Sequence, residues 1–111
     1  LVMADTLKVL GQLAPDATTD TDLYTVPNET VATISSIAAC NRSGGALTIR
    51  VAVRPQGATV ANKHYIYYGK SVAANDTEFI IIGITLSASD VVSVYASSGD
   101  MSFSIFGVET S

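Results

Sequence analysis

The chain has 111 residues and a mass of 11.5 kDa, the size of one domain, because neither half would be long enough to build its own core. Hydrophobic residues make up 48% and charged residues 14%, a balance that excludes intrinsic disorder, and no apolar run approaches the roughly 18 residues that span a bilayer. A net charge of −4 argues against a broad nucleic-acid-binding surface, and a single cysteine excludes an internal disulfide.

The residue types favour strands over helices. Val, Ile and Thr together number 33, against 8 for Glu, Lys and Gln, and branched side chains suit a pleated strand better than a helix. In chain order, strands are expected near 6–13, 22–26, 30–41, 47–54, 63–68, 77–86, 90–96 and 101–108, with turns between them that include Gly69-Lys70. This spacing predicts one all-β, antiparallel β-sandwich domain over residues 1–111, either immunoglobulin-like or a jelly roll.

The segment 47–54 alternates more regularly than any other. Leu47, Ile49, Val51 and Val53 are apolar, and the residues between them are polar or small. A period of two is typical of a strand with one buried face. The alternation therefore predicts that these four side chains point into the core.

Three other segments carry apolar side chains on both faces. In 77–86 the run Phe79–Ile84 is apolar throughout except for Gly83, while 63–68 and 101–108 place aromatic residues out of step with their neighbours. Two explanations remain open: a bulge or covering loop, or an interface between subunits, since exposed apolar patches usually mark contact surfaces. The candidate interface residues are Tyr65, Tyr67, Phe79, Ile80, Ile82 and Phe106.

Few side chains could carry catalysis. His64 and Cys40 are the only residues of their kinds, and their strand context favours a hydrogen-bonded histidine and a small buried cysteine over a Cys–His dyad. Asp16, Asp20 and Asp22 share a loop that lacks the Gly and distal Glu of an EF-hand, which favours a solvated loop over a weak calcium site. The sequence therefore predicts no enzyme, no metal and no cofactor.

The three arginines lie close together in the sequence. Arg50 and Arg54 project from one face of their strand, and Arg42 lies at the preceding hairpin. They could meet an acidic partner such as a neighbouring subunit, or they could be the charges that commonly keep strand edges solvated.

Two stretches resemble small structural proteins of tailed bacteriophages. The first is Leu-Tyr-Thr-Val-Pro over 23–27, followed after a turn by Ala-Thr-Ile-Ser-Ser-Ile-Ala-Ala-Cys-Asn-Arg-Ser over 32–43. The second is Gly-Ile-Thr-Leu-Ser-Ala-Ser-Asp-Val-Val-Ser-Val-Tyr-Ala over 83–96 with Phe-Ser-Ile-Phe-Gly-Val-Glu over 103–109, where Ser89 stands in place of the usual Gly. These stretches cover somewhat under half of the chain. The resemblance implies a β-sandwich, association with the virion and no enzymatic activity, and it carries over no functional residue.

The expected function is therefore that of a bacteriophage virion structural protein, a homo-oligomeric capsid decoration or cement protein or a head–tail accessory protein. Its expected partners are further copies of itself, for example in a trimer, and other virion proteins such as the major capsid protein, with neither nucleic acid nor membrane. The alternative is a tail-fibre or baseplate module that binds a receptor or glycan through Tyr65, Tyr67 and Tyr68. The first residues do not resemble a signal peptide, so synthesis is expected in the host bacterial cytoplasm, with a natural start at Met3.

Overall fold

The computed structural model describes residues 4–111, so the expected start at Met3 lies outside the described residues. Between the fourth and fifth strands the chain makes two short 3₁₀ turns, η1 (Pro55–Gly57) and η2 (Asn62–His64). No helix in the described range is long and apolar enough to cross a membrane. The strands are β1 (Asp5–Leu13), β2 (Thr21–Thr25), β3 (Val31–Asn41), β4 (Leu47–Arg54), β5 (Tyr65–Val72), β6 (Thr77–Leu86), β7 (Val91–Ala96) and β8 (Met101–Thr110).

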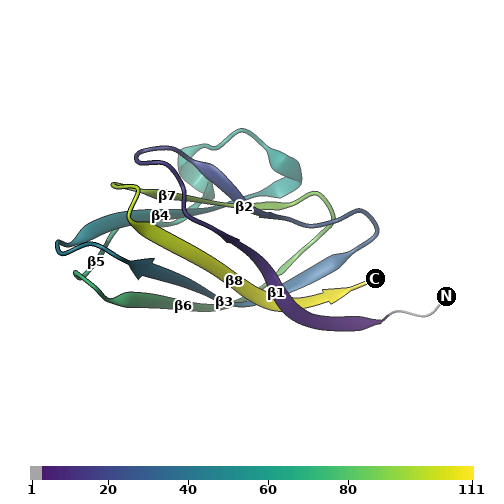
Figure 1. The fold of residues 1–111 in the computed structure, drawn as a ribbon. Coiled ribbons are helices and arrows are strands. Elements are labelled where there is room, and N and C mark those ends of the chain that lie inside the picture. Colours follow the sequence, from purple (N-terminus) through teal and green to yellow (C-terminus); the bar gives the residue numbers. More distant parts are fainter. Residues whose placement is uncertain (1–3) are drawn as a thin grey trace.

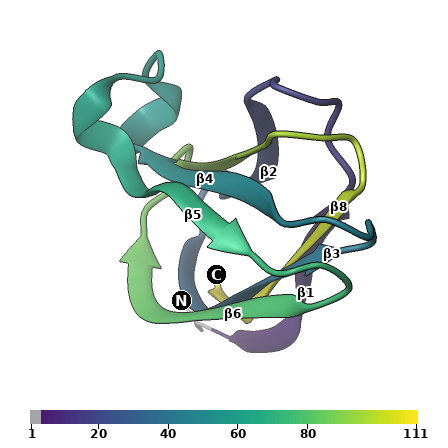
Figure 2. The same cartoon turned by 90° about the vertical axis from the view of Figure 1, so that its left-hand side faces the viewer.

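The eight strands form two four-stranded antiparallel sheets, which confirms the predicted β-sandwich. The strand orders are β1-β8-β3-β6 and β2-β7-β4-β5. The first strand pairs with the last, β2 with β7, β3 with β6 and β4 with β5, as if one long hairpin were rolled up. This nested pairing is the jelly roll, so it decides between the two sandwich types that the sequence allowed. Figure 1 shows β1, β8, β3 and β6 as the lower layer, and Figure 2 shows β4, β5 and β2 above β6 and β1.

The core lies between the two sheets and follows the alternation of the sequence. Ile49 and Val51 are fully buried, and Leu47 and Val53 pack against the core from the ends of β4, so the predicted inward face of this strand is confirmed. Phe103 joins them from the opposite sheet. Burial of each such side chain contributes about 1.5–3 kcal/mol to folding.

Strand β6 is apolar on both faces, but its two faces have different surroundings. Ile80 is fully buried, and Ile82 and Ile84 are partly buried against the core. The odd-numbered residues Phe79 and Ile81 point to the outside. Ile80 is therefore wrong as a candidate interface residue and Ile82 belongs to the core, because the even-numbered side chains of this strand fill the space between the sheets.

Strand β5 departs from strict alternation because of a bulge. Its register against β4 runs from Tyr67 directly to Tyr65, so Ile66 is left without a partner. Tyr67 is half-buried and packs against the core, whereas Tyr65 and Tyr68 both turn outward. The expected turn at Gly69-Lys70 is also wrong, because Gly69 takes its positive φ of 72° within the strand. The strand continues to Val72.

Candidate functional site

The middle of the outer face of the β1-β8-β3-β6 sheet carries no charge and is here called the apolar face; Asp5 lies on the row beyond it at the end of β1. Strand register defines three rows of four residues that cross all four strands. None of these positions carries a charge, and the side chains are apolar ones, hydroxyls and one carboxamide. The rows are Leu7-Val108-Thr33-Thr85, Val9-Phe106-Ser36-Ile81 and Gln12-Ser104-Ala38-Phe79.

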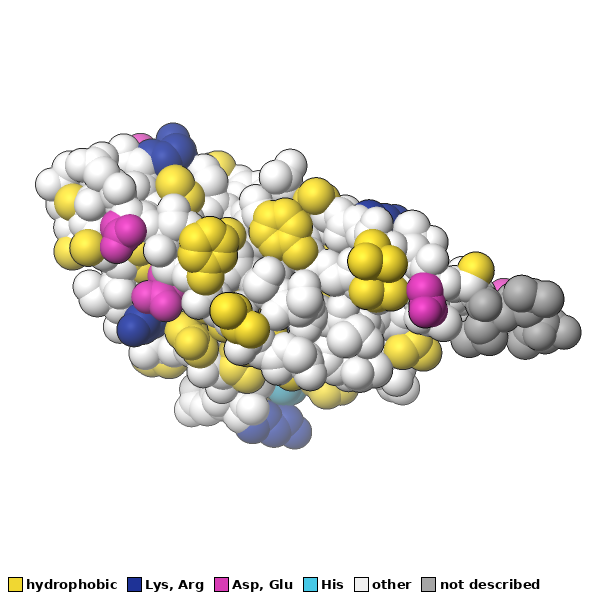
Figure 3. Space-filling model, turned by 90° about the horizontal axis from the view of Figure 1, so that it is seen from below, with side chains coloured by type: hydrophobic (Ala, Val, Ile, Leu, Met, Phe, Trp, Pro, Cys, Tyr) yellow, Lys and Arg dark blue, Asp and Glu magenta, His cyan; other side chains and the backbone are white. Residues whose placement is uncertain are grey.

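Large side chains of the apolar face are strongly exposed. Ile81 is 83% exposed, Leu7 78%, Phe79 61% and Val9 50%. Figure 3 views this side of the molecule and shows hydrophobic side chains among uncharged ones across the middle, with charged side chains toward the margins. Several large exposed apolar side chains on one face are typical of a contact surface.

The candidate residues Phe79 and Phe106 lie on the apolar face, with Phe106 half-buried in its middle row. Sequence reasoning missed Ile81, Leu7 and Val9. The apolar run 79–84 indicated that one face of this strand exposes apolar side chains. It did not show which of the two faces is the inner one, so it left open whether Ile81 is exposed. Leu7 and Val9 share a face in the sequence, yet only their pairing with Val108 and Phe106 of β8 makes that face the outer one.

The other sheet presents an aromatic cluster around Arg50. Arg50 of β4 pairs in register with Tyr68 of β5 on one side and with Tyr95 of β7 on the other. Its guanidinium carbon lies 4.3 Å from the centre of the Tyr68 ring and 4.1 Å from that of Tyr95. Two cation–π contacts therefore hold the guanidinium in place.

A surface depression with a volume of about 450 Å³ lies beside this cluster and is lined by Asn62, Tyr65 and Tyr68. The two tyrosine rings meet nearly at right angles, with interplanar angle 80° and centres 5.0 Å apart. The bulge at Ile66 is what brings them to one face. The sequence placed Tyr65 and Tyr68 on opposite faces, because it does not reveal the bulge.

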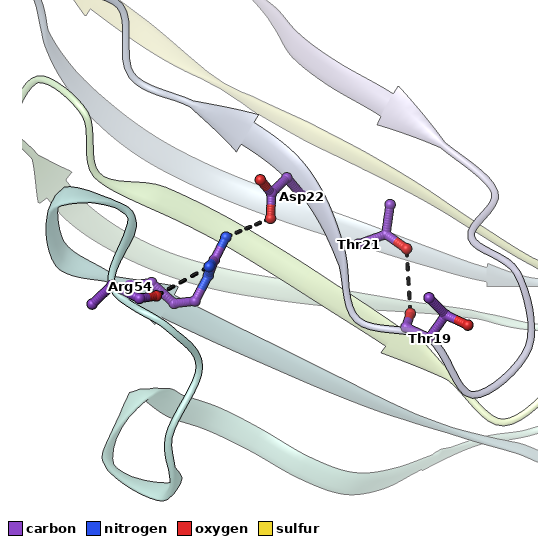
Figure 4. Close-up of polar contacts among 5 residues, drawn as sticks. Thr19, Thr21, Asp22 and Arg54 are labelled. Carbon is purple, nitrogen blue, oxygen red and sulfur yellow. Dashed lines mark hydrogen bonds and ion pairs between the residues drawn. The ribbon is translucent and has the colours of Figure 1, made fainter.

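The three arginines do not form one cluster. Arg42 bonds the carbonyl oxygen of Gly99 and the hydroxyl of Ser102 at the β7–β8 turn, each at 2.8 Å. Arg54 forms an ion pair with Asp22 of β2 across β7, as Figure 4 shows. Asp22 is therefore the counter-ion of Arg54.

Among residues 4–111, no three His, Cys, Asp or Glu side chains gather as they would to hold a metal ion.

Cys40 and His64 do not form a dyad. Asn41, next to Cys40, donates a hydrogen bond to the carbonyl of Val72 at the end of β5, and His64 precedes the start of that strand. The eight residues of β5 place its two ends about 25 Å apart, so Cys40 lies near one end of this strand and His64 near the other. His64 is buried, and its Nδ1 accepts a hydrogen bond from the Ala61 amide at 3.0 Å, whereas Cys40 is only half-buried on the outer side of β3.

An electrostatic contact joins the two sheets where β1, β2 and β8 meet. Glu109 of β8 lies 2.8 Å from the Lys8 ammonium and accepts a hydrogen bond of 2.6 Å from the Tyr24 hydroxyl. The bond from Lys8, and then that from Tyr24, lowers the pKa of Glu109 below its usual range. Burial, followed by the bond to this carboxylate and its charge, raises the pKa of Tyr24 well above its usual value. The contact thus stabilises the packing of the sheets.

The sequence matches no protein-family model and no curated protein. The fold is similar to that of a chain from the T13 viral particle of infectious bursal disease virus, an icosahedral virus, with a TM-score of 0.55 and 9% identity over 98% of this chain. A chain from the Gx strain of the same virus aligns over 98% of this chain with a TM-score of 0.49 and 10% identity. This chain spans 30% and 32% of the lengths of those two chains, so it corresponds to about a third of each. At such low identity the likeness to the T13 particle chain is one of fold alone.

Proposed function

We propose that this chain is a structural protein of a bacteriophage virion and that it assembles with further copies of itself through the apolar face. The observation that carries the proposal is the apolar face, whose three rows carry no charge and on which Ile81 is 83% exposed. The jelly-roll fold supports it, as does the likeness to a chain of an icosahedral virus particle. The resemblance of 23–43 and 83–109 to phage structural proteins supports the bacteriophage as the source.

A second copy of the chain is the occupant that the charge distribution favours. The chain carries a net charge of −4, so two copies repel each other at most orientations. The apolar face has no charge in any of its three rows, so two such faces can meet without like-charge repulsion. Removing apolar surface from water contributes about 25 cal/mol per Å², so burial of this face between two copies favours their association.

The proposed role requires no chemistry from the protein. Three features support this proposal: Cys40 is separated from His64, Asp22 pairs with Arg54, and Glu109 pairs with Lys8. We therefore propose that the chain acts by binding other virion proteins, the major capsid protein among them, as a decoration, cement or head–tail accessory protein without enzymatic activity.

The double substitution Phe79→Ser and Ile81→Ser tests the assembly. Both side chains are exposed, so the variant should fold like the wild type. In sedimentation at tens of micromolar, the wild type should form oligomers and the variant should shift toward monomer. Tyr68→Ser on the other sheet is the matched control and should sediment like the wild type. A wild-type chain that stays monomeric, or a variant that assembles equally well, would contradict the proposed contact.

Electron microscopy of virions labelled with an antibody against this chain tests the place of action. Regular labelling of the capsid or of the head–tail junction is the expected result. Labelling confined to the fibres or the baseplate would favour the receptor-binding alternative, and particles without label would contradict a virion role.

A further inference from the structure

The depression on the β2-β7-β4-β5 sheet is open to solvent and has room for a small ligand. Its volume of about 450 Å³ falls within the roughly 300–1,000 Å³ typical of small-ligand sites. Tyr68 is 63% exposed, so much of its side chain faces water. Exposure of an aromatic ring to water is unfavourable in free energy, and a ligand that covers the ring would remove this cost.

The two rings form a corner rather than a flat plate. Tyr65 and Tyr68 stand at 80° to each other with centres 5.0 Å apart. One ring can pack against the C–H face of a sugar while the other closes its edge. A pyranose has both an apolar C–H face and a rim of hydroxyls, so it fits such a corner better than a wholly apolar ligand does.

The lining also offers free polar groups at its rim. Among the side-chain hydrogen bonds of residues 4–111, none involves the carboxamide of Asn62 or the hydroxyls of Tyr65 and Tyr68. The amide can donate and accept, and so can each phenol. These groups are therefore available to the hydroxyls of a saccharide.

Arg50 gives the site a positive charge in a chain that is negative overall. Its guanidinium lies over the Tyr68 ring and has no ion pair within the described residues, whereas Arg54 is paired with Asp22 and Lys8 with Glu109. Neither contact is a hydrogen bond, and no side-chain hydrogen bond of residues 4–111 uses the N–H groups of Arg50. A guanidinium with free N–H groups matches a carboxylate in geometry and charge.

We propose that this depression binds an acidic saccharide, in which a sugar ring packs on Tyr68 and its carboxylate pairs with Arg50. The chemical class is a uronic-acid-containing oligosaccharide. This site lies on the sheet opposite the apolar face, so the proposal stands independently of assembly and of a virion role.

Titration of the full chain with an oligogalacturonate tests the proposal. The chain has five tyrosines and no tryptophan, so tyrosine fluorescence reports on the cluster, and isothermal calorimetry measures the affinity. The acidic oligosaccharide should bind, and a neutral malto-oligosaccharide of equal length should bind at least about tenfold more weakly. Tyr68→Ala and Arg50→Gln should each weaken binding about tenfold or more.

Arg42→Gln is the matched control, because it removes the same charge from a turn outside the depression. It should leave the affinity within about twofold of the wild type, and far-ultraviolet circular dichroism should show that all variants keep their sheets. An equal loss from Arg42→Gln and Arg50→Gln would mean non-specific attraction and overturn the site. Equal affinity for the neutral sugar, or no binding at millimolar concentration, would overturn it as well.

Discussion

Replacing Gly107 with alanine should destabilise the sandwich strongly, because the backbone of β3 leaves no room for a side chain there. Gly107 lies in β8 opposite Ile34, and β8 lies between β1 and β3. An added Cβ would lie 2.1 Å from the carbonyl oxygen of Thr33 and 3.1 Å from the Cα of Ile34. The first distance is about 1 Å too short, and the obstacle is backbone, so two central strands would have to separate.

The size of the effect follows from that separation. Overpacking costs typically about 1–3 kcal/mol when side chains can adjust, so a clash with backbone should cost about 3 kcal/mol or more. For a chain of this length that corresponds to a fall in Tm of about 10–20 °C. Gly99→Ala is the matched control, since no atom lies within 4 Å of its added Cβ, and its Tm should stay near that of the wild type.

Thermal unfolding followed by circular dichroism measures both variants, and urea unfolding supplies the free energy. A Gly107→Ala variant that melts within 2 °C of the wild type would refute the close approach of β8 and β3. It would also show that the register Ile34–Gly107 is wrong.

Three further variants test the core, a charge and a turn. Val51→Asp should cost more than about 4 kcal/mol or abolish folding, as measured by urea unfolding, because it buries an unpaired charge. The pKa of Glu109 is lower in the folded chain than in the unfolded chain, where it is near 4.3. The carboxylate therefore contributes stability at pH values above the unfolded pKa, and this contribution is lost as the pH falls through the folded pKa. Glu109→Gln should thus flatten the acid limb of a plot of Tm against pH. Ser89→Gly should raise the stability by about 0.5–1 kcal/mol in thermal unfolding, because Ser89 has a φ of 73° that glycine adopts without strain.

Local patterns in the sequence were enough to predict the strands and much of the core. The alternation from Leu47 to Val53 identified an inward face, since a pleated strand turns successive side chains to opposite sides. Branched residues and turn residues located all eight strands near their observed positions, with the largest difference at the end of β5. The exposed Ser89 turn is a further local feature, because the usual Gly at this position matches the positive φ that the structure has there.

The strand order could not be read from the sequence, because pairing partners such as β1 and β8 lie about 100 residues apart and no local pattern encodes their register. For a similar reason the sequence could not show which residues of β6 are exposed. A run that is apolar on both faces has no period, so only the position of the second sheet makes Ile80 a core residue and Ile81 a surface residue.

The two candidate surfaces are products of the tertiary structure. The apolar face exists because β1, β8, β3 and β6 bring together residues that are scattered along the chain, with Val9, Phe106 and Ile81 in one row. The aromatic depression exists because a bulge, which shifts the side-chain alternation by one residue, turns Tyr65 and Tyr68 to the same side. The sequence determined which side chains are apolar or aromatic, and the pairing of distant strands decided which of them meet, because contacts across a sheet depend on register rather than on neighbours in the chain.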